Sequence, residues 1–295
     1  MDVLPGVLAA SEGYLLDVYP AHRAYSMRQL RRDYSGYALK LRRADNETAD
    51  VNFDVNGLVS DNSIIANPSG GVSVTDLNTW VGSGDAFCTT WYDQSGEGVN
   101  ALQSTELQQP KLYSSGTIIT EGSPSRPALL FDGSNDHLSI DDAGLSFGST
   151  FAFAVFNNQS SSGTRVVWSL SSGTSGWFIH IHIGGSDALY YDPGYPYPSN
   201  FYPQVTGQHL WGYKGAVGSQ ILYKNGTASP EGDLTPTDAF TDTSPTLSNG
   251  IGGVPGVGGG FYWQGEFQEF IAFDSDQSSN RTTIEADINS HFEIY

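Results

Sequence analysis

Two pairs of side chains in this sequence have a spacing that could bind a metal ion. His180 and His182 are two residues apart in an alternating apolar segment, so both imidazoles would project from one face of a strand. No third ligand is visible in the sequence, and the alternative is an outward face with two polar positions. Asp132 and Asp136 flank a turn and could bind Ca²⁺ through their oxygens, or they could bond to the turn's own backbone. We therefore predict no metal and no cofactor, with Ca²⁺ at this turn as the alternative.

A Tyr- and Pro-rich segment between residues 190 and 203 is the most unusual stretch of the chain. Its four prolines would stiffen the rings, and rigid aromatic side chains lose little entropy on binding. Such rings suit stacking on a sugar or contact with another protein. The alternative is a loop that protects the edge of its own sheet. The candidate ligand or interface residues are Tyr190, Tyr191, Tyr195, Tyr197, Phe201 and Tyr202.

The segment from Trp91 to Gln103 combines an aspartate, a serine and two glycines after an apolar run. Gly96 and Gly98 can take positive φ at no steric cost, and Asp93 and Ser95 can bond to their own backbone. The pattern predicts a strand that ends in a tightly hydrogen-bonded loop. Its residue types suit holding a loop and are poorly suited to catalysis.

Charge is unevenly distributed along the chain, whose net charge is −19. Seven of the 13 basic residues, but only four of the 32 acidic ones, precede residue 44. The acidic remainder excludes nucleic acid and anionic membrane as expected partners. The basic segment could anchor the protein on an acidic neighbour, or it could be a solvated helix face that pairs with the acidic body. The candidate anchoring residues are Arg23, Arg28, Arg31 and Arg32.

Composition and periodicity predict an all-β fold. With 35 Gly, 16 Tyr and 15 Phe in 295 residues and only 15% charged residues, the chain has the profile of a β-sandwich or barrel. Residues 1–12 are expected to be an arm and residues 13–295 a single domain. The one cysteine, Cys88, excludes an internal disulfide and indicates a small buried apolar side chain. The N-terminus lacks the pattern of a secretory signal, which predicts folding in a reducing compartment.

Local patterns place the elements. Alternating residues and turn signals predict strands over 38–43, 129–131, 137–140, 151–156, 177–183 and 266–273, and an Asn-Gly hairpin over 221–227. The strand over 266–273 would put Glu266 and Glu269 on opposite faces, so they should not form a catalytic pair. Helices are expected over 25–34, over 76–80 with Asp76 as its N-cap, and at the C-terminus after a cap at Asp274 or Asp276.

Several motifs occur in the same order as in a known enzyme family. They are Tyr14–Tyr19, Ala24–Leu30, Tyr34–Leu39, Trp91–Gln103, Ile251–Gly253, Phe261–Phe267 and Asp276–Ser278. Over residues 14–295 this order resembles the catalytic domain of family 54 α-L-arabinofuranosidases. The resemblance implies a two-sheet β-sandwich.

The resemblance also implies where catalytic carboxylates should stand. The family retains configuration with a nucleophile and an acid/base, both carboxylates. In the strand that matches the nucleophile's, Gly176–His182, its place is taken by Ile179, and Val254 follows Ile-Gly-Gly where the family has its acid/base. Neither side chain can attack an anomeric carbon or transfer a proton. The family's adjacent cysteines and disulfides are also absent from this sequence. The resemblance therefore predicts the scaffold without the furanosidase machinery.

A second resemblance concerns the later part of the chain. Phe131–Asp136 and Leu222–Gly226 resemble laminin-G or concanavalin-like jelly rolls. Together with Asp276–Arg281 and the terminal Ile294–Tyr295, the whole resembles domains in structural proteins of tailed bacteriophages. This implies a concanavalin-like two-sheet sandwich with a short N-terminal helix and a C-terminal helix.

The function expected from this resemblance is that of a non-catalytic virion component, such as a capsid decoration, fibre or tail-associated protein. Its expected location is the virion after synthesis in the host cytoplasm. Its expected partners are other virion proteins, further copies of itself, with a trimer as one option, and host-surface glycans. The alternatives are a carbohydrate-binding module and a glycoside hydrolase or depolymerase with displaced carboxylates.

Overall fold

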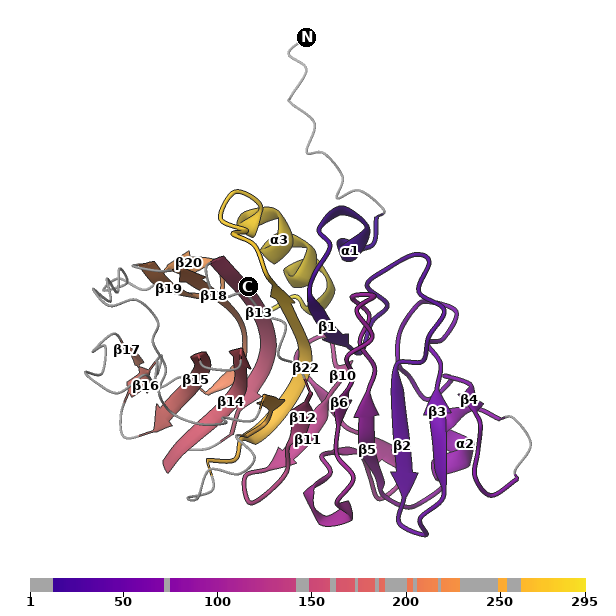
Figure 1. Ribbon diagram of the computed structural model, residues 1–295. Helices are drawn as coiled ribbons and strands as arrows, with labels where there is room; N and C mark the ends of the chain where they lie inside the picture. The colour runs from indigo at the N-terminus through magenta and orange to yellow at the C-terminus, as the bar shows by residue number, and fades with distance from the viewer. Residues whose placement is uncertain are drawn as a thin grey trace.

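The computed structural model describes residues 13–71, 75–141, 149–159, 163–172, 175–183, 186–188, 201–203, 206–216, 219–228, 249–253 and 261–295. Only the backbone is described for 149, 163–164, 170–172, 175–183, 186–188, 201–203, 215–216 and 219–220. The described backbone is mostly β, and antiparallel strands dominate it (Figure 1). No helix in these ranges is both long enough and apolar enough to cross a membrane.

One layer, which we call the first sheet, carries long strands from the second half of the chain. Its central strand is β22 (Gln264–Phe273). Along one edge of β22 follow β13 (Ser149–Asn158), β18 (Gly207–Ala216), β19 (Ser219–Lys224) and β20 (Thr227–Ala228). Along its other edge lie β1 (Arg23–Ser26) and β11 (Leu129–Asp132). The first strand of the chain is thereby hydrogen-bonded to the last.

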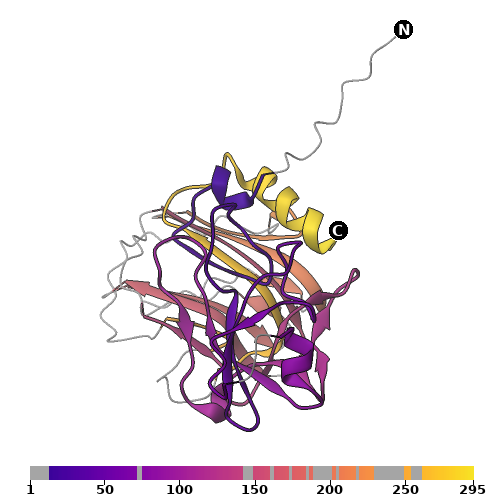
Figure 2. The same ribbon diagram turned by 90° about the vertical axis from the view of Figure 1, so that its right-hand side faces the viewer.

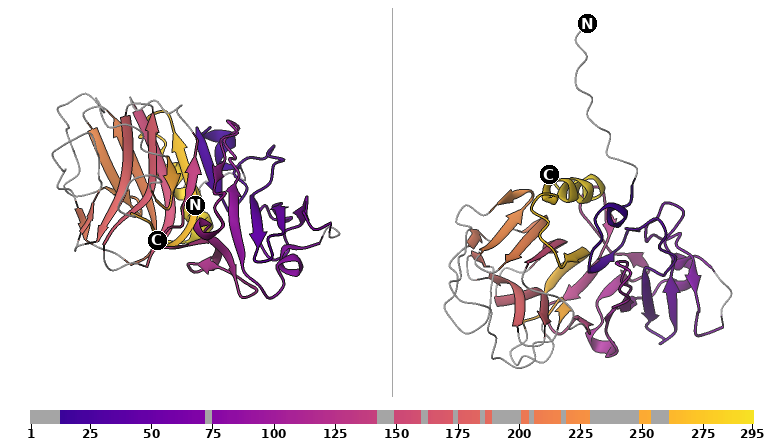
Figure 3. Two further views of the ribbon diagram at one scale, coloured as in Figure 1. Left: turned by 60° about the horizontal axis from the view of Figure 1, so that its bottom comes forward. Right: turned by 45° about the horizontal axis from the view of Figure 1, so that its top comes forward.

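The facing layer, the second sheet, joins strands from both halves of the chain. Its order is β15 (Ser175–Ile183), β14 (Gly163–Ser172), β21 (Gly250–Ile251), β12 (Leu138–Ile140), β6 (Ala101–Leu102), β5 (Ala86–Trp91), β2 (Leu39–Arg43), β3 (Thr48–Val51) and β4 (Ile65–Ala66). β7 (Lys111–Ser114) pairs with both β11 and β5 and so links the two sheets. Figure 3 shows β2–β5 at the opposite end of the molecule from the curved strands β13–β19.

Short elements complete the described chain. They are α1 (Leu15–Val18), α2 (Leu77–Val81), the 3₁₀ turn η1 (Glu106–Gln108), β8 (Thr117–Ile118), β9 (Thr120–Glu121), β10 (Arg126–Pro127), β16 (Ser186–Ala188), β17 (Phe201–Pro203) and α3 (Arg281–Phe292). α3 lies across the outer face of the first sheet (Figure 2).

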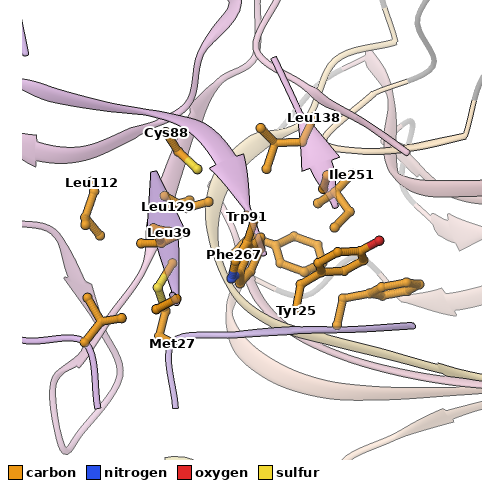
Figure 4. Close-up of a cluster of buried hydrophobic side chains, with 14 of the residues drawn as sticks. Tyr25, Met27, Leu39, Cys88, Trp91, Leu112, Leu129, Leu138, Ile251 and Phe267 are labelled. Carbon is orange, nitrogen blue, oxygen red and sulfur yellow. The ribbon is translucent and has the colours of Figure 1, made fainter. Parts of the chain in front are cut away.

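The main core fills the space between the two sheets. Tyr25, Trp91 and Phe267 meet there, with ring centroids about 6 Å apart, and the cluster includes Cys88 (Figure 4). Cys88 is fully buried, as predicted. A second cluster lies between the outer face of the first sheet and α3, where Ile284, Ile288 and Phe292 form the buried stripe of the helix. The predicted closing helix is confirmed, but it begins after Asn280 and not after Asp274 or Asp276.

An irregularity in β22 changes which of its side chains share a face. Pairing with β13 passes from Phe267 directly to Glu269, so Gln268 is the extra residue of a β-bulge. Phe267 and Phe270 consequently both point into the main core. Glu266, which pairs with Asn157, and Glu269 both lie on the outer face. The prediction that these two glutamates lie on opposite faces is therefore wrong.

Most of the remaining elements agree with the sequence patterns. The predicted strands are confirmed within a few residues, and Asp76 caps α2 by accepting the Thr79 N–H at 2.8 Å. The helix predicted over 25–34 is wrong, because Arg23–Ser26 is extended and pairs with β22. All four of these residues are buried, so the near-helical spacing of apolar residues does not reflect an amphipathic helix. The short N-terminal helix is instead α1.

The Trp91–Gln103 loop holds the N-terminal segment in place. Asp93 accepts hydrogen bonds from the N–H groups of Ala24 and Ser95, both at 3.0 Å, and from the Ser95 hydroxyl at 2.7 Å. Gln94, which is fully buried, accepts the Leu30 N–H at 2.8 Å and donates to the carbonyls of Ser26 and Arg28. The prediction of a tightly hydrogen-bonded loop is confirmed.

Removal of the Gln94 amide should destabilise the fold. We expect Gln94→Ala to lower the free energy of unfolding by roughly 2–4 kcal/mol, because buried backbone groups left without a partner cost about 1–3 kcal/mol each. Urea denaturation followed by tryptophan fluorescence measures the change. The exposed Glu97→Ala in the same loop is the control and should stay within about 0.5 kcal/mol of the unmodified protein. Equal stability of the two variants would contradict the role given to Gln94.

Candidate functional site

The segment Ile251-Gly252-Gly253, singled out by its resemblance, bends sharply at the end of β21. Gly252 has a φ of +82°, and a Cβ there would lie 2.2 Å from the ring of Phe131. A Cβ on Gly253 would lie 2.8 Å from the ring of Tyr262 and 3.4 Å from the Cβ of His137. Only glycine can bring the backbone this close to the rings of Phe131 and Tyr262. We call the group of residues 132–137, 252–253 and Tyr262 the bend site.

Neighbouring strands fix the position of the bend. The Gly252 N–H donates to the Val167 carbonyl of β14 at 2.7 Å, and its carbonyl accepts the Trp263 N–H at 2.8 Å. The Arg165 guanidinium donates to the carbonyls of Tyr262 and Gly133. Arg165 thus joins the segment before β22 to the turn after β11, and its side chain holds both sides of the bend site.

The turn over residues 132–136 contributes the titratable carboxyl of the site. Asp136 accepts the Asp132 N–H at 3.0 Å, and Asp132 accepts the N–H groups of Ser134 at 2.7 Å and Asn135 at 3.2 Å. Burial, and then repulsion from Asp132, raise the pKa of Asp136 to about 7. This carboxyl therefore holds its proton well above the range that is usual for aspartate.

His137 is a neutral hydrogen-bonding group. Its Nδ1 lies 2.9 Å from the Asn135 carbonyl, and its Nε2 lies 3.0 Å from the amide nitrogen of Gln103. These partners assign the proton to Nδ1, because the Gln103 amide donates to Nε2. Burial lowers the pKa of His137, which keeps the ring uncharged near neutral pH. Its ring lies 5.8 Å from that of the partly exposed Tyr262.

The two carboxyl groups of the bend site do not have the arrangement of a glycosidase pair. Hydrolysis by retention or inversion needs two carboxyl groups on either side of the bond. Asp132 and Asp136 belong to one turn, and their side-chain oxygens accept backbone N–H groups of that turn. Such bonding to the turn's own backbone was the alternative to Ca²⁺ binding at these two residues. Among the described residues, no group of three or more His, Cys, Asp or Glu side chains could hold a metal ion.

Several candidate residues fall where the structure describes little. Tyr190, Tyr191, Tyr195, Tyr197 and Val254 lie outside the described residues. Phe201 and Tyr202 belong to β17, whose backbone pairs with β16. Ile179, His180 and His182 belong to β15, where the Ile179 backbone pairs with Trp168. Roles of these side chains in metal, ligand or interface contacts remain predictions.

The candidate anchoring arginines have partners within this chain. Arg28 lies between Glu269, at 2.8 Å, and Asp287 of α3, also at 2.8 Å. Arg31 pairs with Asp33, and Arg32 lies near Asp17 and over the Tyr14 ring. Arg23 is buried. Arg31 and Arg32 keep the more exposed guanidinium groups, and an anchoring role stays a prediction.

Sequence reasoning missed the residues that surround the bend. Nothing in the sequence links His137, Arg165 and Tyr262, which come from three separate elements. The one available signal was the Gly252–Gly253 pair after a β-branched residue, which indicates a close backbone approach without naming its partner.

Comparison with solved structures identifies the fold. A variant of a glycoside hydrolase family 54 α-L-arabinofuranosidase soaked with 4-nitrophenyl α-L-arabinofuranoside aligns with 91% of this chain at a TM-score of 0.65 and 15% identity. An arabinofuranosidase complexed with arabinofuranosyl-α-1,2-xylobiose aligns over the same share at 0.58 and 14%. A Trypanosoma rangeli sialidase in complex with sialic acid aligns with 68% of this chain and 31% of its own, at a TM-score of 0.47 and 14% identity.

The chain therefore has the β-sandwich fold of the family 54 arabinofuranosidases, as its sequence resemblance predicted. It spans 62% of the length of those arabinofuranosidase chains. No protein-family model matches the chain, and no curated protein matches it.

The raised pKa of Asp136 predicts a specific pH dependence of stability. The native carboxyl keeps its proton to about pH 7, whereas the unfolded one loses it near pH 4, so this contribution is complete below pH 4 and is lost as pH rises to 7. We expect the stability of the unmodified protein relative to Asp136→Asn to fall by up to about 4 kcal/mol over this window. Urea denaturation at several pH values measures it.

Asp85→Asn provides the opposite case as a control. Hydrogen bonds from Lys111 and from the Ser115 N–H lower the pKa of Asp85, so its contribution to stability is present above pH 4 and lost as pH falls. A flat pH dependence for the difference between Asp136→Asn and the unmodified protein would show that the native carboxyl is ionised as in water.

Metal removal should leave the fold unchanged. The carboxylates of Asp132 and Asp136 already accept backbone N–H groups of their own turn, so the turn needs no cation. We expect the same melting temperature in excess EDTA and in excess Ca²⁺, measured by calorimetry. A rise of several degrees with Ca²⁺ that Asp132→Asn removes would establish the alternative.

Proposed function

We propose that this chain is a carbohydrate-binding β-sandwich that uses the arabinofuranosidase scaffold without its hydrolytic chemistry. One observation carries the proposal: the bend at Gly252–Gly253 is built onto rings, yet Val254 follows it where the resemblance expects the acid/base. The sequence has no Asp or Glu from residue 243 to 265, and none in β15. The resemblance places its two carboxylates in these two segments.

The bend site has the chemistry for an uncharged sugar. Tyr262 offers part of an aromatic face, and aromatic faces bind apolar surfaces while their edges stay polar. Beside it, the turn 132–136 offers the exposed Ser134 and the partly exposed Asn135, and His137 is neutral. Buried polar groups that hold fixed orientations give such a surface its specificity.

Assays with a chromogenic substrate and a polysaccharide separate binding from hydrolysis. With 4-nitrophenyl α-L-arabinofuranoside we expect no more nitrophenol from the protein than from its Asp136→Asn variant, because no carboxylate pair flanks the bend among the described residues. In affinity electrophoresis with arabinoxylan we expect retardation that Tyr262→Ala weakens. Tyr295→Ala, which alters an exposed tyrosine elsewhere, is the matched control.

Two outcomes would contradict this function. Turnover that Asp136→Asn or another single carboxylate change abolishes would establish a hydrolase with displaced carboxylates. Retardation that is the same in Tyr262→Ala as in the unmodified protein would show that the bend site does not bind the polysaccharide.

A virion setting is the further part of this proposal. It is supported by the resemblance of the later sequence to laminin-G-like domains and to tailed-phage structural proteins. In the structure, Asp276 accepts the Ser278 N–H at 2.8 Å and Gln277 accepts from the Asn280 amide at 2.9 Å, so the similar segment builds the turn before α3. In this setting the chain would be a decoration, fibre or tail component, self-associated as a homo-oligomer. Immunogold labelling of purified phage particles tests it, and unlabelled particles would contradict it.

A further inference from the structure

A second surface with the groups of a sugar-binding site lies at the other end of the second sheet. Antiparallel register brings the start of β2, the end of β3, the end of β4 and the end of β5 together, since Leu39 pairs with both Val51 and Trp91 and Asp50 pairs with Ala66. Tyr37, Asp50, Asn67 and Tyr92 lie at these strand ends. Figure 1 shows β2–β5 at the far side from β14 and β15.

Four partly exposed aromatic rings gather at this edge. Tyr37 and Tyr92 lie 5.9 Å apart between ring centroids, and Tyr34 lies 6.3 Å from Phe53. The Tyr34 hydroxyl donates to the Tyr37 carbonyl at 2.9 Å, which joins the two ring pairs. All four side chains are partly exposed, and Phe53 also packs against the main core.

A buried carboxylate holds the polar edges of these rings in place. Asp50 is only 5% exposed, and it accepts the Tyr92 hydroxyl at 2.6 Å and the Asn67 amide at 2.8 Å. The same Asn67 nitrogen lies 3.1 Å from the Tyr37 hydroxyl oxygen. The Tyr37 hydroxyl can therefore donate outward while it accepts from Asn67, and the exposed Asn67 keeps its carbonyl oxygen as an acceptor. Asn67 holds this position at a φ of +48°.

We infer that Tyr34, Tyr37, Tyr92 and Phe53, with Asn67 at their edge, form a second carbohydrate subsite for a neutral pyranose chain. Partly exposed rings fit the apolar face of a pyranose, and the fixed donor and acceptor fit its equatorial hydroxyls. The Asp50 carboxylate and the net charge of −19 disfavour acidic sugars. The inference rests on the proposed function only for the class of ligand, because its residues are separate from the bend site.

Isothermal titration of the full chain with xylohexaose tests the inference, with cellohexaose and mannohexaose as further probes. We expect Tyr37→Ala to weaken binding at this subsite by at least about tenfold, through loss of a stacking ring. Tyr37→Phe keeps the ring and should lose less. Tyr295→Ala should bind like the unmodified protein, and melting temperatures of all variants show whether the fold persists.

The variants distinguish the two surfaces. Loss of binding in Tyr37→Ala but not in Tyr262→Ala supports this subsite and contradicts the bend site. Loss in Tyr262→Ala alone overturns the subsite and leaves the proposed function intact, and partial loss in each supports both. The inference is also overturned if no probe binds the unmodified protein, or if Tyr37→Ala changes self-association in ultracentrifugation and not sugar binding, which would identify a protein interface.

Discussion

The rest of the structure depends on how the Gln94 side chain completes the backbone hydrogen bonds of residues 26–30. Beyond β1 this segment bonds to residues 57–59 through Met27 and Gln29, and the fully buried Gln94 amide supplies further partners for the backbone of Ser26, Arg28 and Leu30. Asp93 accepts the Ala24 N–H at the same time, and this bond helps to keep β1 in register with β22. Arg28 is thereby carried to Glu269 and Asp287, the contact that ties α3 to the first sheet.

The buried charges at this contact give specificity more than stability. Removing charges from water costs about as much as their attraction returns, so a buried ion pair mainly penalises arrangements in which one charge loses its partner. Arg28 bonds to both oxygens of Glu269 and reaches Asp287. The Ser26 hydroxyl adds a further bond to Glu269 at 2.7 Å. A helix shifted along its axis would leave Arg28 with fewer acceptors, which defines one docked position for α3.

Sequence patterns predicted those parts of the fold whose causes are local. The alternation over 177–183, the Asn225-Gly226 hairpin and the Asp76 cap each depend on a few neighbouring residues. The extended state of Arg23–Ser26 depends on a strand at the other end of the chain. The bulge at Gln268 places Glu266 and Glu269 on the same face of β22, where simple alternation assigns them to opposite faces. For the same reason the Gly252–Gly253 pair could be recognised as a close approach, while its partners His137 and Tyr262 could not be named.

The pairing of β1 with β22 also constrains how this protein is made. Ser26 and Glu269, which are 243 positions apart, meet through it. During synthesis from the N-terminus, the Trp91–Gln103 loop can gather residues 24–30 early, but the sheet edge that β1 completes does not exist until β22 has emerged. Contacts of such long sequence separation are slow to form because loop closure must precede them. The core can therefore close only after β22 has been synthesised, with the N-terminal segment already held by Gln94 for its last partner.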